Sequence, residues 1–192
     1  MTQTVLFLTG PGGSGKTSLA KAFVSYKLAH RELWTMVDKD TTSKAYCEFV
    51  LRSTGHDPND RDSPWYKANL RDLDYQSALD VAKEQLELGF NVVMPGPWTK
   101  EIENETLTPE IFKTNLDLKI IKVGLIIEKE ELKNRILKRK SPRDVVKLEN
   151  LDKFVDSAYK IDYNKLDFTL DCSLSFSTQL KKLNHYLKDN LK

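Results

Sequence analysis

Residues 10–18, GPGGSGKTS, have the composition and spacing of a phosphate-binding loop. The stretch satisfies the pattern G-x-x-x-x-G-K-[ST], with an apolar run before it and a helical pattern after it. Glycines let the backbone turn tightly, so that its N–H groups point at phosphate oxygens. We expect Lys16 to lie between the β- and γ-phosphates of a nucleoside triphosphate, and the Thr17 hydroxyl to bind Mg²⁺. The predicted nucleotide-binding residues are Gly10, Gly12, Gly13, Ser14, Gly15, Lys16, Thr17 and Ser18.

Two carboxylates, Asp38 and Asp40, follow a second apolar run in the sequence VDKDTT. In open α/β sheets, ligands lie outside the carboxyl ends of the strands. If this strand neighbours the first in space, both acids lie at the same edge as the phosphate loop. Either carboxylate, Asp38 or Asp40, could then accept the proton of an attacking hydroxyl or hold Mg²⁺ together with Thr17. The alternative is that Asp40 only caps the helix that follows.

The third apolar run, NVVMPGPW at residues 91–98, ends without an acidic residue. Phosphate-loop proteins usually carry a carboxylate for Mg²⁺ at the end of such a strand. That carboxylate must therefore come from Asp38 or Asp40, or be absent. Its absence at this strand favours phosphate transfer to an acceptor over rapid hydrolysis of the triphosphate.

Residues 133–147 form a strongly basic segment with seven Lys and Arg residues against a single acid, Asp144. Arg135 and Arg139 are four positions apart and project from one face of a helix, and Arg143 follows the break at Pro142. We predict a lid whose Arg135, Arg139 and Arg143 stabilise the charge of the transferred phosphate. Two alternatives remain, a solvated basic helix and a contact with the nucleic-acid backbone.

The segment 54–75 is predicted to be a small insertion that binds the acceptor. Arg61 and Arg71 could hold an anionic acceptor, whereas four carboxylates could hold a cationic one. The sequence does not distinguish between these two kinds of acceptor. The carboxylates are Asp60, Asp62, Asp72 and Asp74. Aromatic side chains are expected either to stack on a planar acceptor or to belong to the core; these are Trp65, Tyr66 and Trp98.

The elements that must position these residues alternate along the chain. Short apolar runs predict strands at residues 5–8, 33–37, 92–94, 119–127 and 167–171. Helical spacing predicts helices at residues 16–29, 41–53, 65–88, near 109, and at 130–140, 147–160 and 178–190. This alternation predicts an α/β fold, a five-stranded, mostly parallel sheet with helices on both faces, in one domain spanning residues 1–192.

The composition is that of a soluble globular protein, with 40% hydrophobic and 30% charged residues among 192. A net charge of +2 predicts no overall affinity for nucleic acid or membranes. No apolar stretch near the start is long enough for a signal peptide or a membrane span. Cys47 and Cys172 match no metal or redox spacing, so we expect reduced thiols and a cytoplasmic protein. The oligomeric state is not predicted.

The order of phosphate loop, Asp-x-Asp-Thr after the second strand, and basic lid resembles the small P-loop kinases. The resemblance is closest to the zeta-toxin and chloramphenicol-phosphotransferase-like branch, which borders on the nucleoside monophosphate kinases. It implies a P-loop NTPase fold and arginines in a lid after the fourth strand. It also implies Asp40 as the general base for the acceptor hydroxyl, with Asp38 assisting the metal or substrate, so that Thr17 and Asp38 are the predicted Mg²⁺ ligands. The leading prediction is an ATP- and Mg²⁺-dependent kinase of a small hydroxyl-bearing molecule. The alternatives are a polynucleotide 5′-hydroxyl kinase and a non-catalytic nucleotide-dependent switch.

Overall fold

The computed structural model describes residues 2–139, 141, 144–158 and 162–191. Its centre is a five-stranded sheet in the order β2-β3-β1-β4-β5, in which every neighbouring pair is parallel. The strands are β1 (Gln3–Thr9), β2 (Trp34–Met36), β3 (Asn91–Pro95), β4 (Leu118–Ile126) and β5 (Phe168–Asp171). The predicted α/β fold with a parallel five-stranded sheet is confirmed.

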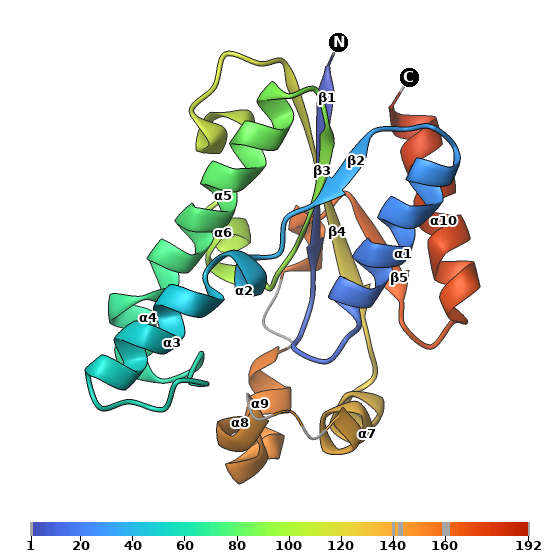
Figure 1. Cartoon of the computed structure of the whole chain (residues 1–192). Helices are drawn as coiled ribbons and strands as arrows, with labels where there is room; N and C mark the ends of the chain where they lie inside the picture. The colour runs from blue at the N-terminus through green and yellow to red at the C-terminus, as the bar shows by residue number, and fades with distance from the viewer. Residues whose placement is uncertain (1, 140, 142–143, 159–161, 192) are drawn as a thin grey trace.

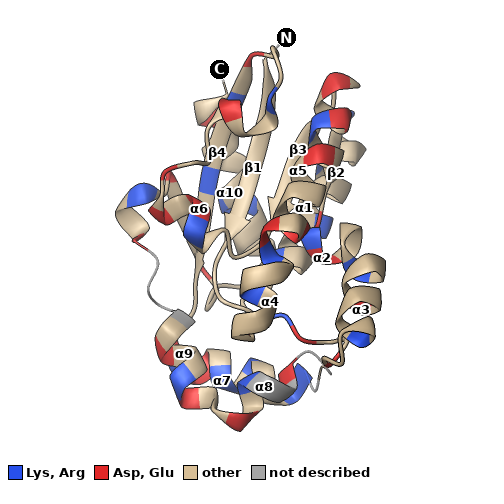
Figure 2. Ribbon diagram, turned by 90° about the vertical axis from the view of Figure 1, so that its left-hand side faces the viewer, with Lys and Arg blue, Asp and Glu red and all other residues tan. Residues whose placement is uncertain are grey.

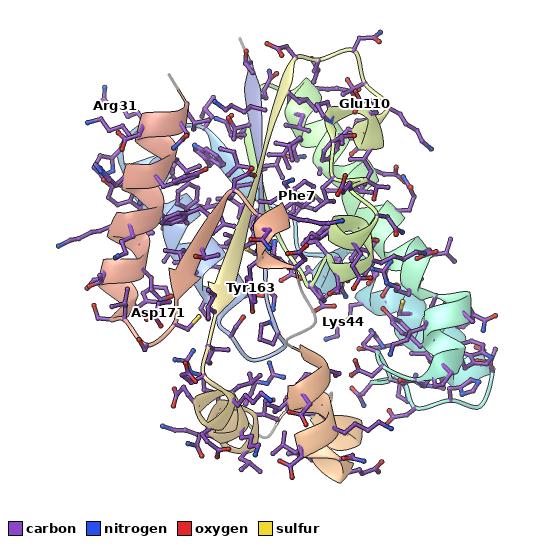
Figure 3. The ribbon with its side chains drawn as sticks, turned by 180° about the vertical axis from the view of Figure 1, so that it is seen from behind. Phe7, Arg31, Lys44, Glu110, Tyr163 and Asp171 are labelled. Carbon is purple, nitrogen blue, oxygen red and sulfur yellow. The ribbon has the colours of Figure 1, made fainter. Side chains whose placement is uncertain are left out.

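The apolar runs form strands because both faces of the sheet are covered. Val5, Leu6, Phe7 and Leu8 of β1 have no exposed surface. Their side chains alternate between the faces, so that Leu6 and Leu8 pack into one apolar cluster and Val5 and Phe7 into another. Figure 3 shows Phe7 in the interior, between the helical layers.

Two helical layers cover the sheet. Helices α1 (Lys16–Ala29) and α10 (Phe176–Asn190) lie on one face, and α5 (Arg71–Glu87) and α6 (Thr99–Glu103) lie on the other (Figure 1). The short 3-10 helix η1 (Pro109–Phe112) adds Phe112 to the second layer. Among the described residues, no helix is both long and apolar enough to cross a membrane.

Three of the predicted helices are each divided in two. The helix expected over 147–160 is α8 (Val145–Glu149) followed by α9 (Leu151–Ala158). The helix expected over 41–53 begins earlier, as α2 (Lys39–Thr42), and continues as α3 (Lys44–Ser53) after Ser43. The buried Ser43 hydroxyl donates a hydrogen bond to the Lys39 carbonyl. The helix expected over 65–88 is α4 (Pro64–Asn69) followed by α5, with buried Leu70 between them. Together α3 and α4 form a small apolar cluster of their own.

Helices α7 (Lys129–Arg139), α8 (Val145–Glu149) and α9 (Leu151–Ala158) lie beyond the carboxyl edge of the sheet, away from the chain ends (Figure 1). A Cβ atom on Gly13 of the phosphate loop would lie 3.2 Å from Leu132 Cδ1 and 3.3 Å from Ile136 Cγ1, both in α7. The buried face of α7 therefore packs directly against the phosphate loop. The 3-10 helix η3 (Tyr163–Lys165) leads from this region into β5.

Candidate active site

The phosphate loop requires glycine at several positions. Gly13 and Gly15 have φ angles of 101° and 96°, in the left-handed region that favours glycine. Gly10 has a φ angle of 141°, and a Cβ atom there would lie 2.9 Å from the Leu125 carbonyl oxygen of β4. Helix α1 begins at Lys16, immediately after this turn. The loop thus places backbone N–H groups at a helix N-terminus, an arrangement that favours anions.

The Lys16 side chain folds back over the loop. Its Nζ atom donates hydrogen bonds of 2.8 Å to the carbonyl oxygens of Gly10 and Pro11. Burial lowers the pKa of Lys16 to about 8, because the charged ammonium loses its hydration. No carboxylate of the described residues forms an ion pair with it. The nearby charges of Asp40 and Asp38 raise this pKa but do not offset the effect of burial. A desolvated cation without an ion-pair partner among the described residues fits a loop built to receive phosphates.

Seven of the eight predicted loop residues line a cavity of about 550 Å³ at this edge of the sheet. The exception is Ser14, which is buried and lies outside the lining. Its hydroxyl has no hydrogen-bond partner among the described residues. Its carbonyl oxygen accepts hydrogen bonds from Arg135 and Cys172. Through its backbone, Ser14 therefore ties the loop to the elements behind it.

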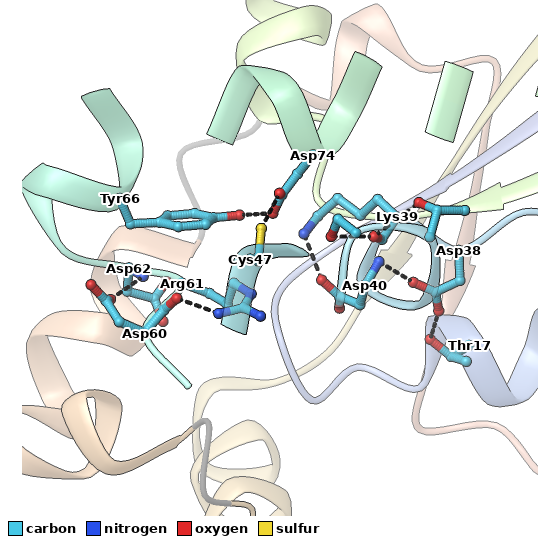
Figure 4. Close-up of polar contacts among 12 residues, drawn as sticks. Thr17, Asp38, Lys39, Asp40, Cys47, Asp60, Arg61, Asp62, Tyr66 and Asp74 are labelled. Atoms are coloured by element: carbon cyan, nitrogen blue, oxygen red, sulfur yellow. Dashed lines mark hydrogen bonds and ion pairs between the residues drawn. The ribbon is translucent and has the colours of Figure 1, made fainter. Parts of the chain in front are cut away.

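Thr17 and Asp38 meet at the mouth of the loop. The Thr17 hydroxyl donates a 3.0 Å hydrogen bond to Asp38 Oδ2 (Figure 4). Asp38 Oδ1 accepts a 2.9 Å hydrogen bond from the backbone N–H of Asp40, which makes Asp38 the N-cap of α2. The alternative in which Asp40 caps the helix is therefore wrong. A hydroxyl beside a carboxylate matches the small protein share of ligands that Mg²⁺ takes next to phosphates.

The strand that carries Asp38 does not neighbour β1, because β3 lies between β2 and β1. The expected position of the two acids depended on these two strands being neighbours, and they are not. Asp38 and Thr17 nevertheless lie in contact. All strands run parallel, so their carboxyl ends share one edge. The end of β3 contributes Pro95, Gly96 and Pro97 to the cavity wall. Among the described residues, no group of three or more His, Cys, Asp or Glu side chains is arranged to hold a metal ion.

Asp40 lines the cavity next to Lys39. The Lys39 ammonium lies 2.6 Å from Asp40 Oδ1 and 5.1 Å from the centre of the Tyr75 ring. Lys39 is buried, whereas the Asp40 side chain is 32% exposed. The carboxylate is thus fixed by Lys39 and lines the cavity. Lys39 is a site residue that sequence reasoning missed, because an isolated Lys between two acids gives no motif.

Arg135 of α7 lines the cavity, but its donors are used within the protein. Its Nε atom lies 2.7 Å from Glu131 Oε1, and Nη2 donates a 3.0 Å hydrogen bond to the Cys172 carbonyl oxygen. A longer contact of 3.5 Å joins Nη1 to the Ser14 carbonyl oxygen. Arg135 therefore links α7 to the phosphate loop and to the loop after β5.

Arg139 also lines the cavity and pairs with the fully buried Asp144 through two hydrogen bonds of 2.7 and 2.5 Å. Burial opposes ionisation of Asp144, but Arg139 and then Lys147 outweigh it and lower its pKa. Lys147 extends the pairing, with Nζ 3.4 Å from Asp144 Oδ1 and 3.0 Å from Asp62 Oδ2. The predicted lid segment thus contacts the predicted insertion. Arg143 lies outside the described residues.

The charges of the insertion 54–75 are mostly paired among themselves or with neighbouring elements. Arg71 binds Glu101 through two hydrogen bonds of 2.8 Å, and Asp72 pairs with Lys100 at 2.7 Å. Asp74 is fully buried and accepts hydrogen bonds from three side chains, Tyr46, Cys47 and Tyr66.

Two of the three aromatic residues have the expected core role. Tyr66 and Trp98 are buried, and Trp98 packs edge-on against Phe7 and Tyr75. Both therefore belong to the core. The Trp65 ring lies 4.1 Å from that of His56, centre to centre. None of these three aromatic residues lines the cavity among the described residues; the ring that does is that of Phe154 in α9.

Known structures share this fold over almost the whole chain. A sugar kinase from Janibacter sp. aligns with a TM-score of 0.65 at 14% identity, over 98% of this chain and 95% of that one. The APS kinase from Mycobacterium tuberculosis, in complex with AMPPNP and APS, aligns with a TM-score of 0.62 at 18% identity, over 97% and 98%. A shikimate kinase from Bacteroides thetaiotaomicron aligns with a TM-score of 0.55 at 16% identity, over 96% of this chain and 98% of that one. At these identities the likeness is one of fold.

No curated protein has a significantly similar sequence. A family model described as AAA domain, AAA_33, matches residues 5–161. This match runs from β1 through the phosphate loop, the Asp38 region and α7 to α9. The chain belongs to the AAA_33 family of AAA domains.

Proposed function

We propose that this protein is a kinase that transfers the γ-phosphate of ATP to a hydroxyl group of a small molecule, with Mg²⁺. The observation that carries the proposal is one cavity of about 550 Å³ shared by the phosphate loop, the Thr17–Asp38 pair and the Asp40 carboxylate. A protein that only hydrolyses or senses a nucleotide has no need of a second carboxylate beside the phosphate loop in the wall of such a cavity.

In this proposal Lys16 and the loop N–H groups bind the phosphates, while Thr17 and Asp38 hold Mg²⁺. The metal ion would neutralise charge on the phosphate oxygens during transfer. Its protein ligands are few, as is usual for Mg²⁺ beside phosphates. The 3.0 Å hydrogen bond between the Thr17 hydroxyl and Asp38 Oδ2 supports this assignment, because it brings the two proposed ligands together.

Asp40 is proposed to orient the acceptor hydroxyl and accept its proton. Lys39 holds one Asp40 oxygen at 2.6 Å, which fixes the direction of the carboxylate. The proton leaves the hydroxyl as the new O–P bond forms and the bond to the leaving phosphate breaks.

Arg139 is the lid arginine that we propose for stabilising the transferred group. Its charge reaches Lys16 and contributes to the lowering of the Lys16 pKa. Arg135, held by Glu131 and two backbone carbonyls, is better suited to positioning the phosphate loop. A role for Arg143 stays a prediction from the sequence.

The comparisons support this proposal through the names of the similar structures, which are sugar, APS and shikimate kinases. The zeta-toxin and chloramphenicol-phosphotransferase branch stays a prediction. So do the single domain over 1–192, the roles of segments 54–75 and 133–147, and the cytoplasmic location.

The test is a screen of pooled hydroxyl-bearing metabolites with γ-labelled ATP, followed by kinetics with the compound that is labelled. Asp40→Asn is expected to lower kcat about 10²- to 10⁴-fold, the usual effect of losing a general base. Its affinity for ATP should stay within about twofold of the original protein. The matched control is Asp57→Asn, on the exposed part of the insertion.

Unchanged transfer in Asp40→Asn would contradict the base assignment. If the protein binds ATP but labels no compound in the screen, the kinase proposal fails and the nucleotide-dependent switch is favoured instead.

A further inference from the structure

The charged side chains that line the cavity form ion pairs, with two notable exceptions among the cations. Six basic residues line it, and four of them pair with carboxylates at 3.0 Å or less. The pairs are Lys39–Asp40, Arg135–Glu131, Arg139–Asp144 and Lys147–Asp62. Among the described residues, the lining cations that lack a carboxylate partner are Lys16 and Arg61. The phosphate loop accounts for Lys16, but nothing in the nucleotide site accounts for Arg61.

The Arg61 guanidinium is held in place by uncharged groups. Its Nη1 atom donates hydrogen bonds to the carbonyl oxygens of Pro58, at 3.0 Å, and Asp60, at 2.6 Å. The guanidinium carbon lies 5.7 Å from the centre of the Tyr66 ring. These contacts fix the plane of the group, and none of them is an ion pair. Figure 4 shows Arg61 among the carboxylates of the insertion, with its dashed contact to Asp60.

The Nε and Nη2 atoms of Arg61 make no hydrogen bond within the part of the chain that the structure describes. This edge of a guanidinium presents two parallel N–H groups, which match the two oxygens of a carboxylate, sulfate or phosphate. Arg61 therefore offers a bidentate site that is already oriented and that faces the same cavity as Asp40.

The carboxylates of the insertion are engaged elsewhere and give no cation site in the cavity. Asp60 accepts hydrogen bonds from the backbone N–H groups of Asp62 and Ser63. Asp62 pairs with Lys147, and Asp72 with Lys100 and Arg71. Asp74 is buried away from the cavity. The sequence leaves an anionic and a cationic acceptor open, and this pairing of the carboxylates favours the anionic one.

We propose that Arg61 binds an anionic group of the acceptor, so that the substrate is a hydroxyl compound that also carries a carboxylate, sulfate or phosphate. This inference rests on the proposed function for the hydroxyl that is phosphorylated. A bidentate contact at one end of the acceptor fixes its orientation, which presents the hydroxyl to Asp40 at the other end. Arg61 is then a substrate-binding residue that determines specificity.

Anion binding is tested directly, without knowledge of the acceptor. The protein is saturated with AMPPNP and Mg²⁺ to fill the phosphate loop, and sulfate, phosphate and acetate are titrated by calorimetry. We expect saturable binding of at least one of these anions. Arg61→Gln should weaken binding of the anion about tenfold or more. Arg61→Lys keeps the charge but loses the two parallel N–H groups, so it should weaken binding by an intermediate factor.

The matched control is Arg52→Gln, an exposed arginine at the end of α3 that lies outside the cavity lining. It should bind the anion as the original protein does, and all variants should keep their affinity for AMPPNP. Thermal unfolding of Arg61→Lys checks that a loss does not come from collapse of the loop at 57–63. Absence of anion binding to the nucleotide-loaded protein, or equal binding by Arg61→Gln, overturns the proposal.

A second arm uses the metabolite screen, with the pool divided by anion exchange into anionic and neutral compounds. Label is expected in the anionic fraction, and Arg61→Gln should raise KM for the labelled compound more than it lowers kcat. Label in the neutral fraction alone overturns this inference and leaves the kinase proposal intact. Anion binding at Arg61 with no label in either fraction supports the Arg61 site and overturns the kinase proposal.

Discussion

The Lys16 ammonium is the clearest case of a single group whose chemistry depends on a ligand. Its pKa of about 8 reflects burial, so the free protein loses this charge as the pH rises through 8. Bound phosphates favour the charged form and raise the pKa again. We expect AMPPNP to bind about tenfold more weakly at pH 9 than at pH 7, because at pH 9 binding requires protonation of Lys16.

Calorimetry at pH 9, in two buffers of different ionisation enthalpy, should show uptake of close to one proton per AMPPNP bound. Lys16→Met, as the control, should bind weakly at both pH values with no proton uptake linked to it. Equal affinity of the original protein at pH 7 and pH 9 would show that burial does not lower the Lys16 pKa.

Asp38 has two roles that substitution can separate. It caps α2 through Oδ1 and contacts Thr17 through Oδ2. Asparagine is as good a cap as aspartate, whereas alanine loses about 1 kcal/mol. Asp38→Asn should therefore keep the free energy of unfolding in urea, and Asp38→Ala should lower it. Both should need more Mg²⁺ for half-maximal transfer, and an unchanged Mg²⁺ requirement in Asp38→Asn would exclude Asp38 as a ligand.

At the scale of elements, one buried carboxylate joins three helices at the insertion. Asp74 of α5 accepts from Tyr46 and Cys47 of α3 and from Tyr66 of α4. Burial and the contact with Asp74 raise the pKa of Cys47 to about 12, so its thiol keeps its proton. Tyr66→Phe should lower the free energy of unfolding by about 1–2 kcal/mol, since a buried acceptor loses a donor.

Urea unfolding measures this loss, and Tyr26→Phe on the more exposed surface of α1 is the matched control. Because Tyr66 lies outside the cavity lining, affinity for AMPPNP should not change in the variant. A loss of nucleotide affinity together with stability would show that α4 and the phosphate loop are coupled.

The α7–α8 region depends on Asp144 in the same way. Removing this carboxylate leaves Arg139 without its partner, at a cost of about 1.5–3 kcal/mol for hydrogen bonds to a charged group. Asp144→Asn should therefore speed hydrogen exchange in α7 and α8 while the sheet keeps its protection. The pairing lowers the Asp144 pKa, so its contribution is present above the ordinary carboxyl pKa near 3.9. This stabilising contribution is lost as the pH falls below that value and the carboxylate becomes protonated. Faster exchange at pH 7 in the original protein than in Asp144→Asn would contradict the predicted role of Asp144.

The strands were predictable because a parallel strand covered on both faces is a continuous apolar run. The expected 119–127 run is β4, Leu118–Ile126, and the expected 167–171 run is β5, Phe168–Asp171. Helix α6 was missed, because it follows Trp98, whose φ angle of 49° is rare outside glycine. The breaks at Ser43 and Leu70 were missed too, since burial in the folded protein decides them.

Within the candidate site, contacts between neighbouring motifs were predictable and distant pairings were not. Thr17 and Asp38 were expected to share one metal ion, and they lie 3.0 Å apart. The Lys147–Asp62 pair joins two segments far apart in the sequence, and no pattern of residues indicates which charges will meet. The proposed anionic charge of the acceptor therefore depends on ion pairs that only the folded structure reveals.

For the molecule as a whole, the basic segment 133–147 has fewer unpaired positive charges than its composition suggests. Figure 2 shows Asp and Glu interspersed with Lys and Arg along α7, α8 and α9. Four of its basic residues form ion pairs with carboxylates; these are Lys133, Arg135, Arg139 and Lys147. The other three are Lys138 and, outside the described residues, Lys140 and Arg143. This pairing favours a small-molecule kinase over a kinase of polynucleotide ends.

The two kinases differ in how binding of a single-stranded oligonucleotide with a 5′-hydroxyl depends on salt. Seven phosphate contacts would give a slope of about −5 for log affinity against log salt, whereas three give about −2. We expect a slope of −2 or shallower by fluorescence anisotropy, because the paired cations would have to give up their carboxylates to bind phosphates. Triple replacement of Glu130, Glu131 and Asp152 by the amides frees Lys133 and Arg135 and should steepen the slope. A slope near −5 in the original protein would show instead that nucleic acid displaces these ion pairs. It would then favour a polynucleotide kinase as the function of this protein.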